Sequence, residues 1–106
     1  MDIIYELLLK IKERPGMYLG KKSIIRLNMF ISGYYLRQYE IDYSYRSILE
    51  KFGDFVNDYC LTNARAAGWA TNIYRYAKKD DEKAFDLFFE LLDEFLKTKE
   101  DKQENV

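Results

Sequence analysis

Four carboxylates in the last third of the chain are the first residues whose types and spacing could do chemistry. They recur at helical intervals, so one side of a helix would carry them all: Asp86, Glu90, Asp93 and Glu94. Two such helices could hold a pair of metal ions, but helical di-iron bundles also use a Glu-x-x-His motif. Because the chain contains no histidine, we interpret the four residues as a solvated acidic face. An acidic partner-binding patch is the alternative.

The composition excludes most familiar catalytic arrangements. Without histidine, the commonest general base and transition-metal ligand are missing, and no Ser-His-Asp or Cys-His arrangement can form. Cys60, the single cysteine, falls beside an apolar stripe, which favours a buried small hydrophobe over a reactive thiol. The sequence has neither a Gly-x-Gly nor a Gly-x-x-x-x-Gly-Lys phosphate loop. We therefore predict no enzymatic activity, no metal and no cofactor; catalysis by carboxylates alone is the weakest alternative.

Charge and hydropathy argue against two classes of partner, nucleic acids and membranes. The chain of 106 residues has a net charge of −1, which argues against a nucleic-acid binder that neutralises phosphates. Its apolar runs fall short of the roughly 20 residues that span a bilayer, and its start does not resemble a signal peptide. We expect a cytoplasmic protein with no nucleic-acid or membrane partner.

Apolar residues recur with helical periodicity in five segments. This pattern predicts an all-α fold, a compact single-domain bundle of about five helices. The helices are expected at residues 2–12, 23–38, 48–59, 64–77 and 81–97. Residues 1–97 would form the domain, and residues 98–106, which are apolar only at the final valine, a frayed or disordered tail.

Single residues refine this outline. Asp2 and Asn63 are expected to cap the first and fourth helices, and Ser47 to begin the third with a capping box. Apolar side chains surround most of the 23–38 helix, which predicts a central position for it. Because a glycine within a helix costs about 1 kcal/mol relative to alanine, Gly33 predicts a close helix crossing.

A glycine- and proline-containing joint connects the first two helices. Pro15 disfavours helical backbone at the residue before it and should end the first helix. Gly16 is expected to take a positive φ in a tight reversal, with Met17 and Tyr18 buried beyond it. Ser23 is a good cap for the second helix. The structural motif comprises Arg14, Pro15, Gly16, Met17, Tyr18, Gly20 and Ser23.

A tyrosine-rich stretch between the second and third helices is the main candidate for binding a protein. Tyr39, Tyr43, Tyr45 and Arg46 gather there, and the core cannot bury all of them. Tyrosine and arginine are enriched in the energetically dominant parts of interfaces. The alternative is that the rings cover the ends of the helical core. Against a cationic nuclease, the acidic face at residues 86–94 would be the better surface.

Two resemblances bear on function. The residues "RPGMYLG" at 14–20 resemble a segment near the start of the ATPase domain of type II topoisomerases, such as the B subunit of DNA gyrase. The Glu- and Asn-bearing helix, the Asp-x-Gly-x-Gly loop and the Gly-rich lid of that family are missing, so the resemblance is local and implies no ATPase.

The second resemblance covers more of the chain. "RPGMYLG" together with "FISGY" at 30–34, "GW" at 68–69 and "AFDLFFELLDEF" at 84–95 is similar to a group of small bacterial proteins. Some of them are encoded beside polymorphic or contact-dependent toxins. This resemblance implies an immunity protein that binds one toxin domain and blocks its active site, and it identifies no binding residues. A helical regulatory or structural adaptor without a toxin partner, in one version a homodimer, is the alternative.

Overall fold

The computed structural model describes the backbone of residues 2–104 and the side chains of residues 2–99. Over this range it contains only helices, which confirms the predicted all-α single domain. The α-helices are α1 (Ile3–Glu13), α2 (Pro15–Leu19), α3 (Ile24–Ile41), α4 (Phe52–Cys60), α5 (Gly68–Tyr76) and α6 (Asp81–Glu104), with short 3-10 helices η1 (Ile48–Glu50) and η2 (Arg65–Ala67). The described residues thus form six α-helices rather than about five, because the glycine–proline joint is itself helical.

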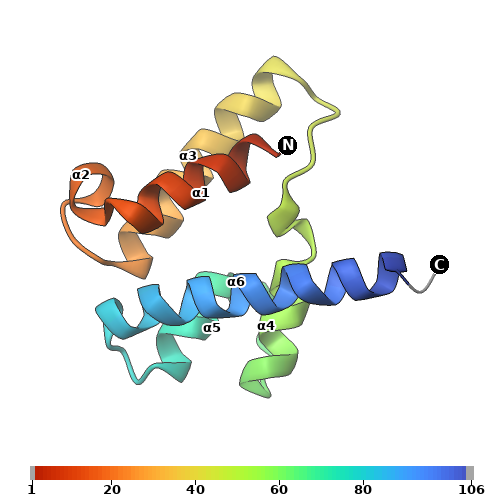
Figure 1. Cartoon of the computed structure of the whole chain (residues 1–106). Helices are drawn as coiled ribbons and strands as arrows, with labels where there is room; N and C mark the ends of the chain where they lie inside the picture. The colour runs from red at the N-terminus through yellow and green to blue at the C-terminus, as the bar shows by residue number, and fades with distance from the viewer. Residues whose placement is uncertain (1, 105–106) are drawn as a thin grey trace.

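The helices form two layers, shown in Figure 1. Helices α1 and α3 lie together in one layer, and α4, α5 and α6 make up the other. Residues 42–47, here called the connector, lead from the end of α3 across to η1 and α4. Helix α3 touches both α5 and α6, so it is the main contact between the layers.

Helix α6 supplies the centre of the core. Phe85, Phe88 and Phe95 are buried on one of its faces, and the Phe88 ring meets Trp69 at 4.9 Å and Phe52 at 5.5 Å between centroids. Large aromatic side chains bury much apolar area per residue and gain further from edge-to-face contacts. A small domain can therefore be stabilised by few residues.

The predicted central position of the 23–38 helix is only partly correct: α3 packs against α1, α2, α5 and α6, but its apolar residues are not buried all round. Only Ile24, Leu27 and Ile31 of α3 are buried, and most of its other apolar side chains lie at the surface. The close crossing expected at Gly33 is also absent, because a Cβ built there would meet no atom within 4 Å. Apolar residues around a helix do not distinguish a central helix from one with an unpartnered face.

The joint between α1 and α3 differs from the expected reversal. Helix α1 ends at Glu13 as predicted, but Pro15 then occupies the first turn of a new helix, α2, where its missing N–H is harmless. Gly16 keeps helical backbone, so the predicted positive φ there is wrong. The left-handed residue is Gly20, with φ of 84°, which ends α2.

The buried residue of this joint lies one or two positions later in the sequence than predicted. Met17 is 69% exposed and Tyr18 half-buried against Phe30, so the expected burial of both is wrong for Met17 and partial for Tyr18. Leu19 is the buried residue. Because α2 is a helix rather than an extended turn, its inward side falls at Leu19.

Helix caps account for the remaining boundaries. The Ser23 hydroxyl accepts a hydrogen bond from the Arg26 amide at 3.1 Å, as predicted. Ser47 caps only the short η1, through the Leu49 amide. The predicted Asn63 cap is wrong, because α5 begins at Gly68, after η2. The expected boundary at residue 97 is also wrong, since α6 continues to Glu104; residues 105–106 lie outside the described residues.

Asp2 caps α1 and also ties it to the connector. One carboxylate oxygen accepts from the amides of Ile4 and Tyr5, at 2.8 and 3.3 Å, which is the predicted cap. The same oxygen accepts from the Tyr45 hydroxyl at 2.8 Å, and the other accepts from the Ile48 amide at 2.7 Å. A single side chain therefore joins two segments that lie more than 40 residues apart in the sequence.

Replacing Asp2 with Ala should lower the free energy of unfolding by about 2–3 kcal/mol, since a helix cap and two long-range hydrogen bonds are lost together. Urea unfolding of Asp2→Ala and Tyr45→Phe, singly and combined, measures the loss and the coupling between the two residues. A loss below about 0.5 kcal/mol in Asp2→Ala would show that the carboxylate does not hold the connector.

Two glycines of the joint make a matched pair. Gly20→Ala should destabilise the fold by about 1–2 kcal/mol, because the residue has φ of 84° and its new Cβ would lie 2.7 Å from an Arg26 guanidinium nitrogen. Gly16→Ala should be neutral or stabilising by up to about 1 kcal/mol, since its helical backbone leaves the Cβ free of contacts. Thermal unfolding of both variants checks the assignment; the reverse order would contradict it.

Candidate functional site

Three of the predicted partner-binding residues come together with one that the sequence interpretation missed. Tyr35 stacks on Tyr39 at 6.2 Å between ring centroids and touches Tyr45 at 5.8 Å. Tyr39 in turn meets Tyr43 edge-on at 5.3 Å. These four rings, from the last turns of α3 and from the connector, form one continuous group, here called the tyrosine cluster.

The members of the tyrosine cluster differ in exposure. Tyr43 is 70% exposed and Tyr39 is 37% exposed, whereas Tyr45 is half-buried with its hydroxyl on Asp2. Tyr45 therefore covers an end of the core, as the alternative interpretation held. Tyr43 and Tyr39 present their rings to solvent and are available to a partner.

Local hydrogen bonds hold the connector in one conformation. The Asp42 carboxylate accepts from the Ser44 amide and hydroxyl at 3.0 and 2.6 Å, and the hydroxyl contact is the main cause that lowers the pKa of Asp42. The Arg46 guanidinium donates to the carbonyls of Tyr43 and Tyr45 at 3.2 and 2.8 Å. The exposed Tyr43 ring thus stands on a braced backbone, which reduces the entropy lost on binding.

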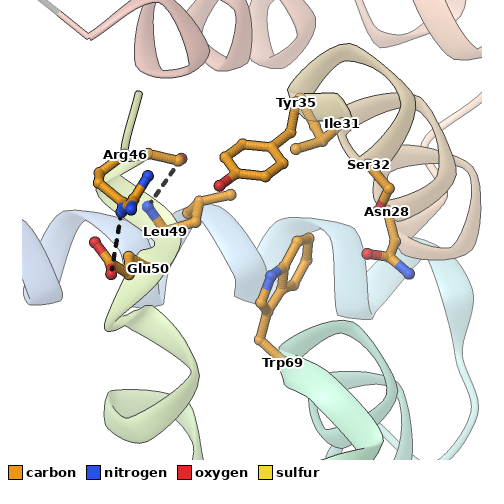
Figure 2. A pocket seen from close by; sticks show the side chains of 9 residues that line it. Asn28, Ile31, Ser32, Tyr35, Arg46, Leu49, Glu50 and Trp69 are labelled. Atoms are coloured by element: carbon orange, nitrogen blue, oxygen red, sulfur yellow. Dashed lines mark hydrogen bonds and ion pairs between the residues drawn. The ribbon is translucent and has the colours of Figure 1, made fainter. Parts of the chain in front are cut away.

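A pocket of about 360 Å³ opens beside the tyrosine cluster (Figure 2). Its walls come from α3, from the connector with η1, and from α5: Asn28, Ile31, Ser32, Tyr35, Arg46, Ser47, Leu49, Glu50 and Trp69. The Trp69 indole and the Tyr35 ring face the space from opposite sides, and Arg46 lies 4.0 Å from Glu50 at one edge. Polar or charged residues thus make up five of the nine that line the pocket, so it combines apolar walls with several groups that can fix a ligand by hydrogen bonds.

The sequence interpretation found one residue of this pocket, Arg46, and missed the rest. Trp69 was noted only within the "GW" motif at 68–69, and Asn28 and Ser32 were not singled out. No sequence pattern links α3 to residues 46–50 and 69, because the three segments meet only after the two layers pack. Aromatic residues without periodic partners were the one available signal.

The four carboxylates of α6 lie on its solvent side: Asp86, Glu90, Asp93 and Glu94. Asp86 pairs with Lys22 at 3.3 Å and Asp93 with Lys12 at 3.9 Å, both between half-exposed side chains. Lysines from other parts of the chain therefore offset part of the negative charge. Among the side chains that the structure describes, no three acidic or cysteine residues cluster closely enough to hold a metal ion.

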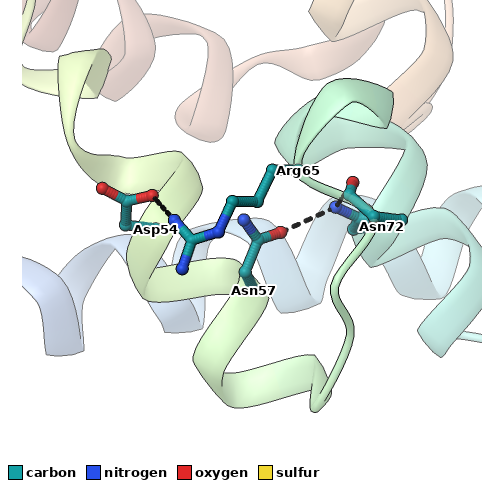
Figure 3. Close-up of polar contacts among 5 residues, drawn as sticks. Asp54, Asn57, Arg65 and Asn72 are labelled. Carbon is teal, nitrogen blue, oxygen red and sulfur yellow. Dashed lines mark hydrogen bonds and ion pairs between the residues drawn. The ribbon is translucent and has the colours of Figure 1, made fainter.

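A buried polar pair positions α5 beneath the pocket (Figure 3). The Asn72 amide nitrogen donates to the Asn57 side-chain oxygen at 2.9 Å and to the Ala64 carbonyl at 3.0 Å. An ion pair between Arg65 and Asp54 spans the same loop at the surface. Because buried amides must find partners, these bonds fix how α4 and α5 pack and hence where Trp69 stands.

Cys60 has the environment of a structural thiol. It is half-buried, and burial raises the pKa of the thiol above its ordinary value. Its sulfur lies 3.9 Å from the Asn72 carbonyl oxygen. A raised pKa keeps the thiol protonated near neutral pH, which favours the inert interpretation.

Comparisons with known proteins provide no relative from which a function could be inferred. No family model matches the chain, and no curated protein or solved structure matches it. None of the helices in the described part of the chain is both long and apolar enough to cross a membrane. The tyrosine cluster and its pocket are therefore the basis for a functional proposal.

Tyr45 should make the protein less stable at alkaline pH. Burial, followed by the hydrogen bond to Asp2, raises the pKa of Tyr45 above its ordinary value of 10.0. Above pH 10 the unfolded chain loses this proton while the folded chain keeps it, so the free energy of unfolding falls as pH rises. Urea unfolding at pH about 8 and about 11 should show a shallower fall in Tyr45→Phe than in the wild type. The remaining fall comes partly from Tyr59 and Cys60, whose pKa values are also raised; an unchanged slope would contradict the assignment.

Proposed function

We propose that this chain is a non-enzymatic, cytoplasmic protein-binding module, and specifically an immunity protein that neutralises a cognate toxin domain. The observation that carries the proposal is the pair of exposed tyrosines, Tyr39 and Tyr43, joined through Tyr35 to a pocket of about 360 Å³ that Trp69 also lines. Tyrosine, tryptophan and arginine are the residue types that dominate binding energy when they flank a desolvated pocket.

The arrangement suits recognition of a protein surface. A side chain of the partner enters the pocket against Trp69 and Tyr35. Tyr39 and Tyr43, which continue the tyrosine cluster outward from Tyr35, contact the partner's surface next to that side chain. Arg46 is already held by two backbone carbonyls, so its planar guanidinium offers its remaining N–H groups without reorganisation. Such a site needs no reactive group, which is consistent with blocking an enzyme rather than acting as one.

The tyrosine surface is favoured over the acidic face of α6 as the contact. Lys12 and Lys22 offset Asp93 and Asp86, so the acidic face attracts a cationic partner less than its sequence alone indicates. Exposed ion pairs contribute little on their own, whereas buried aromatic contacts contribute most of the affinity.

Co-expression with a toxin encoded by a neighbouring reading frame tests this function. The wild-type chain should restore growth and bind the toxin, and Tyr43→Ala should weaken binding about tenfold or more, since it removes an aromatic contact without touching the core. Tyr76→Ala, which alters a 50% exposed tyrosine at the end of α5, is the matched control and should bind normally.

Three outcomes would contradict the proposal. Consistent absence of a toxin-like neighbour, or failure to restore growth, would remove the immunity function. Equal loss in Tyr43→Ala and Tyr76→Ala would show that the tyrosine cluster is not the contact. Loss of binding in Glu90→Ala with normal binding in Tyr43→Ala would move the contact to the acidic face of α6.

A further inference from the structure

One face of α3 carries an apolar line that stays largely exposed, although its first two residues, Ile25 and Met29, also border a small hollow against α5. Ile25, Met29 and Leu36 are 46%, 71% and 57% exposed. Met29 and Leu36 are one heptad apart and Ile25 lies one turn before Met29, so the three side chains follow one side of the helix. Three exposed apolar side chains on one side of a single helix offer a surface for contact with another molecule.

Gly33 lies in the middle of this face, and no contact within the single chain explains why a glycine occupies this position. It is in an 18-residue helix and keeps ordinary helical backbone, where glycine costs about 1 kcal/mol relative to alanine. A Cβ added to it would meet no atom within 4 Å. Gly33 makes a shallow point between Met29 and Leu36 at which a second helix can approach closely.

Two charged residues on the same face indicate that the second helix is α3 of another copy of the chain and that the two helices run antiparallel. Arg26 and Glu40 lie seven positions before and seven after Gly33, on one side of α3. If two α3 helices paired in parallel, Arg26 would face the second copy's Arg26 and Glu40 its Glu40, so like charges would repel. Paired antiparallel about Gly33, Arg26 faces the partner's Glu40, Met29 comes within one position of the partner's Leu36, and the helix dipoles oppose one another favourably.

Both charged groups already have one partner within the chain and retain capacity for another. One Arg26 nitrogen donates to the Leu19 carbonyl at 2.8 Å, which leaves other guanidinium N–H groups free to donate. Glu40 pairs with Arg37 at 3.5 Å, between exposed side chains. A carboxylate accepts several hydrogen bonds, so a second arginine can join this pair.

We propose that two copies of this chain form a homodimer through antiparallel α3 helices that cross at Gly33. The apolar line supplies burial, Gly33 the close approach, and the Arg26–Glu40 pairs the register. A two-fold contact of this type is closed and stops at the dimer. The net charge of −1 opposes such association little. The inference does not rest on a toxin partner and would hold equally for an adaptor.

Light scattering coupled to size exclusion over a dilution series tests the proposal. The wild type should shift from dimer to monomer on dilution, and Met29→Asp should raise the dimer dissociation constant about tenfold or more, since it places a charge in the contact twice. Met17→Asp is the matched control, because Met17 is 69% exposed against 71% for Met29 but lies on α2. A wild type that stays monomeric, forms larger assemblies, or responds equally to both substitutions would overturn the proposal.

A substitution at Gly33 separates association from folding. Gly33→Ala should raise the unfolding temperature of the monomer, through helix propensity, and raise the dimer dissociation constant, through the added methyl at the crossing. Gly53→Ala, in α4, is the control, because its Cβ also meets no atom within 4 Å; it should stabilise the monomer and leave association unchanged. Unchanged association in Gly33→Ala would overturn the crossing.

Charge reversal tests the antiparallel direction. Arg26→Glu and Glu40→Arg should each weaken self-association, since each places like charges opposite one another. An equal mixture of the two variants should restore the dimer as a heterodimer, because both pairs are then complementary. Single variants that associate as well as the wild type would overturn the antiparallel register.

Discussion

Burial of the aromatic face of α6 is the constraint on which the rest of the structure depends. The chain has no internal disulfide to hold it, and the largest of its fully buried side chains are Phe52, Phe85 and Phe88. Helices α3, α4 and α5 each pack on α6. Because these rings need partners on several sides, the aromatic face of α6 lies at the centre of the core, and each helix, α6 included, keeps one side facing outward.

The position of α3 follows from that constraint and explains both surfaces proposed to bind. Its inner side meets α5 and α6, and its end is tied through the connector to Asp2. The pocket around Trp69 lies between α3, the connector with η1, and α5. Its outer side, with Met29 and Leu36, remains in water. One helix thus lines the pocket proposed to bind a toxin domain and carries the exposed apolar face proposed to pair with a second copy of the chain.

Rigidity distinguishes the tyrosine cluster from a chance collection of exposed rings. Hydrogen bonds brace the connector on both sides of Tyr43: Asp42 accepts from Ser44, and Arg46 donates to the Tyr43 carbonyl. The Tyr45 hydroxyl ties the connector to Asp2. A braced loop loses little entropy when a partner covers it, so more of the contact energy appears as affinity. The same bonds that complete the fold therefore prepare the proposed binding surface.

The sequence by itself determined the helical class, the Asp2 and Ser23 caps and the end of α1, because periodicity, capping and the effect of proline are local. It also placed the tyrosines near one another, since they are neighbours in the chain. Only the tertiary structure decided which helix is central, that Gly20 rather than Gly16 is left-handed, and that Trp69 joins the pocket. These depend on contacts between distant segments, where alternative packings satisfy the same apolar pattern until all the helices are assembled.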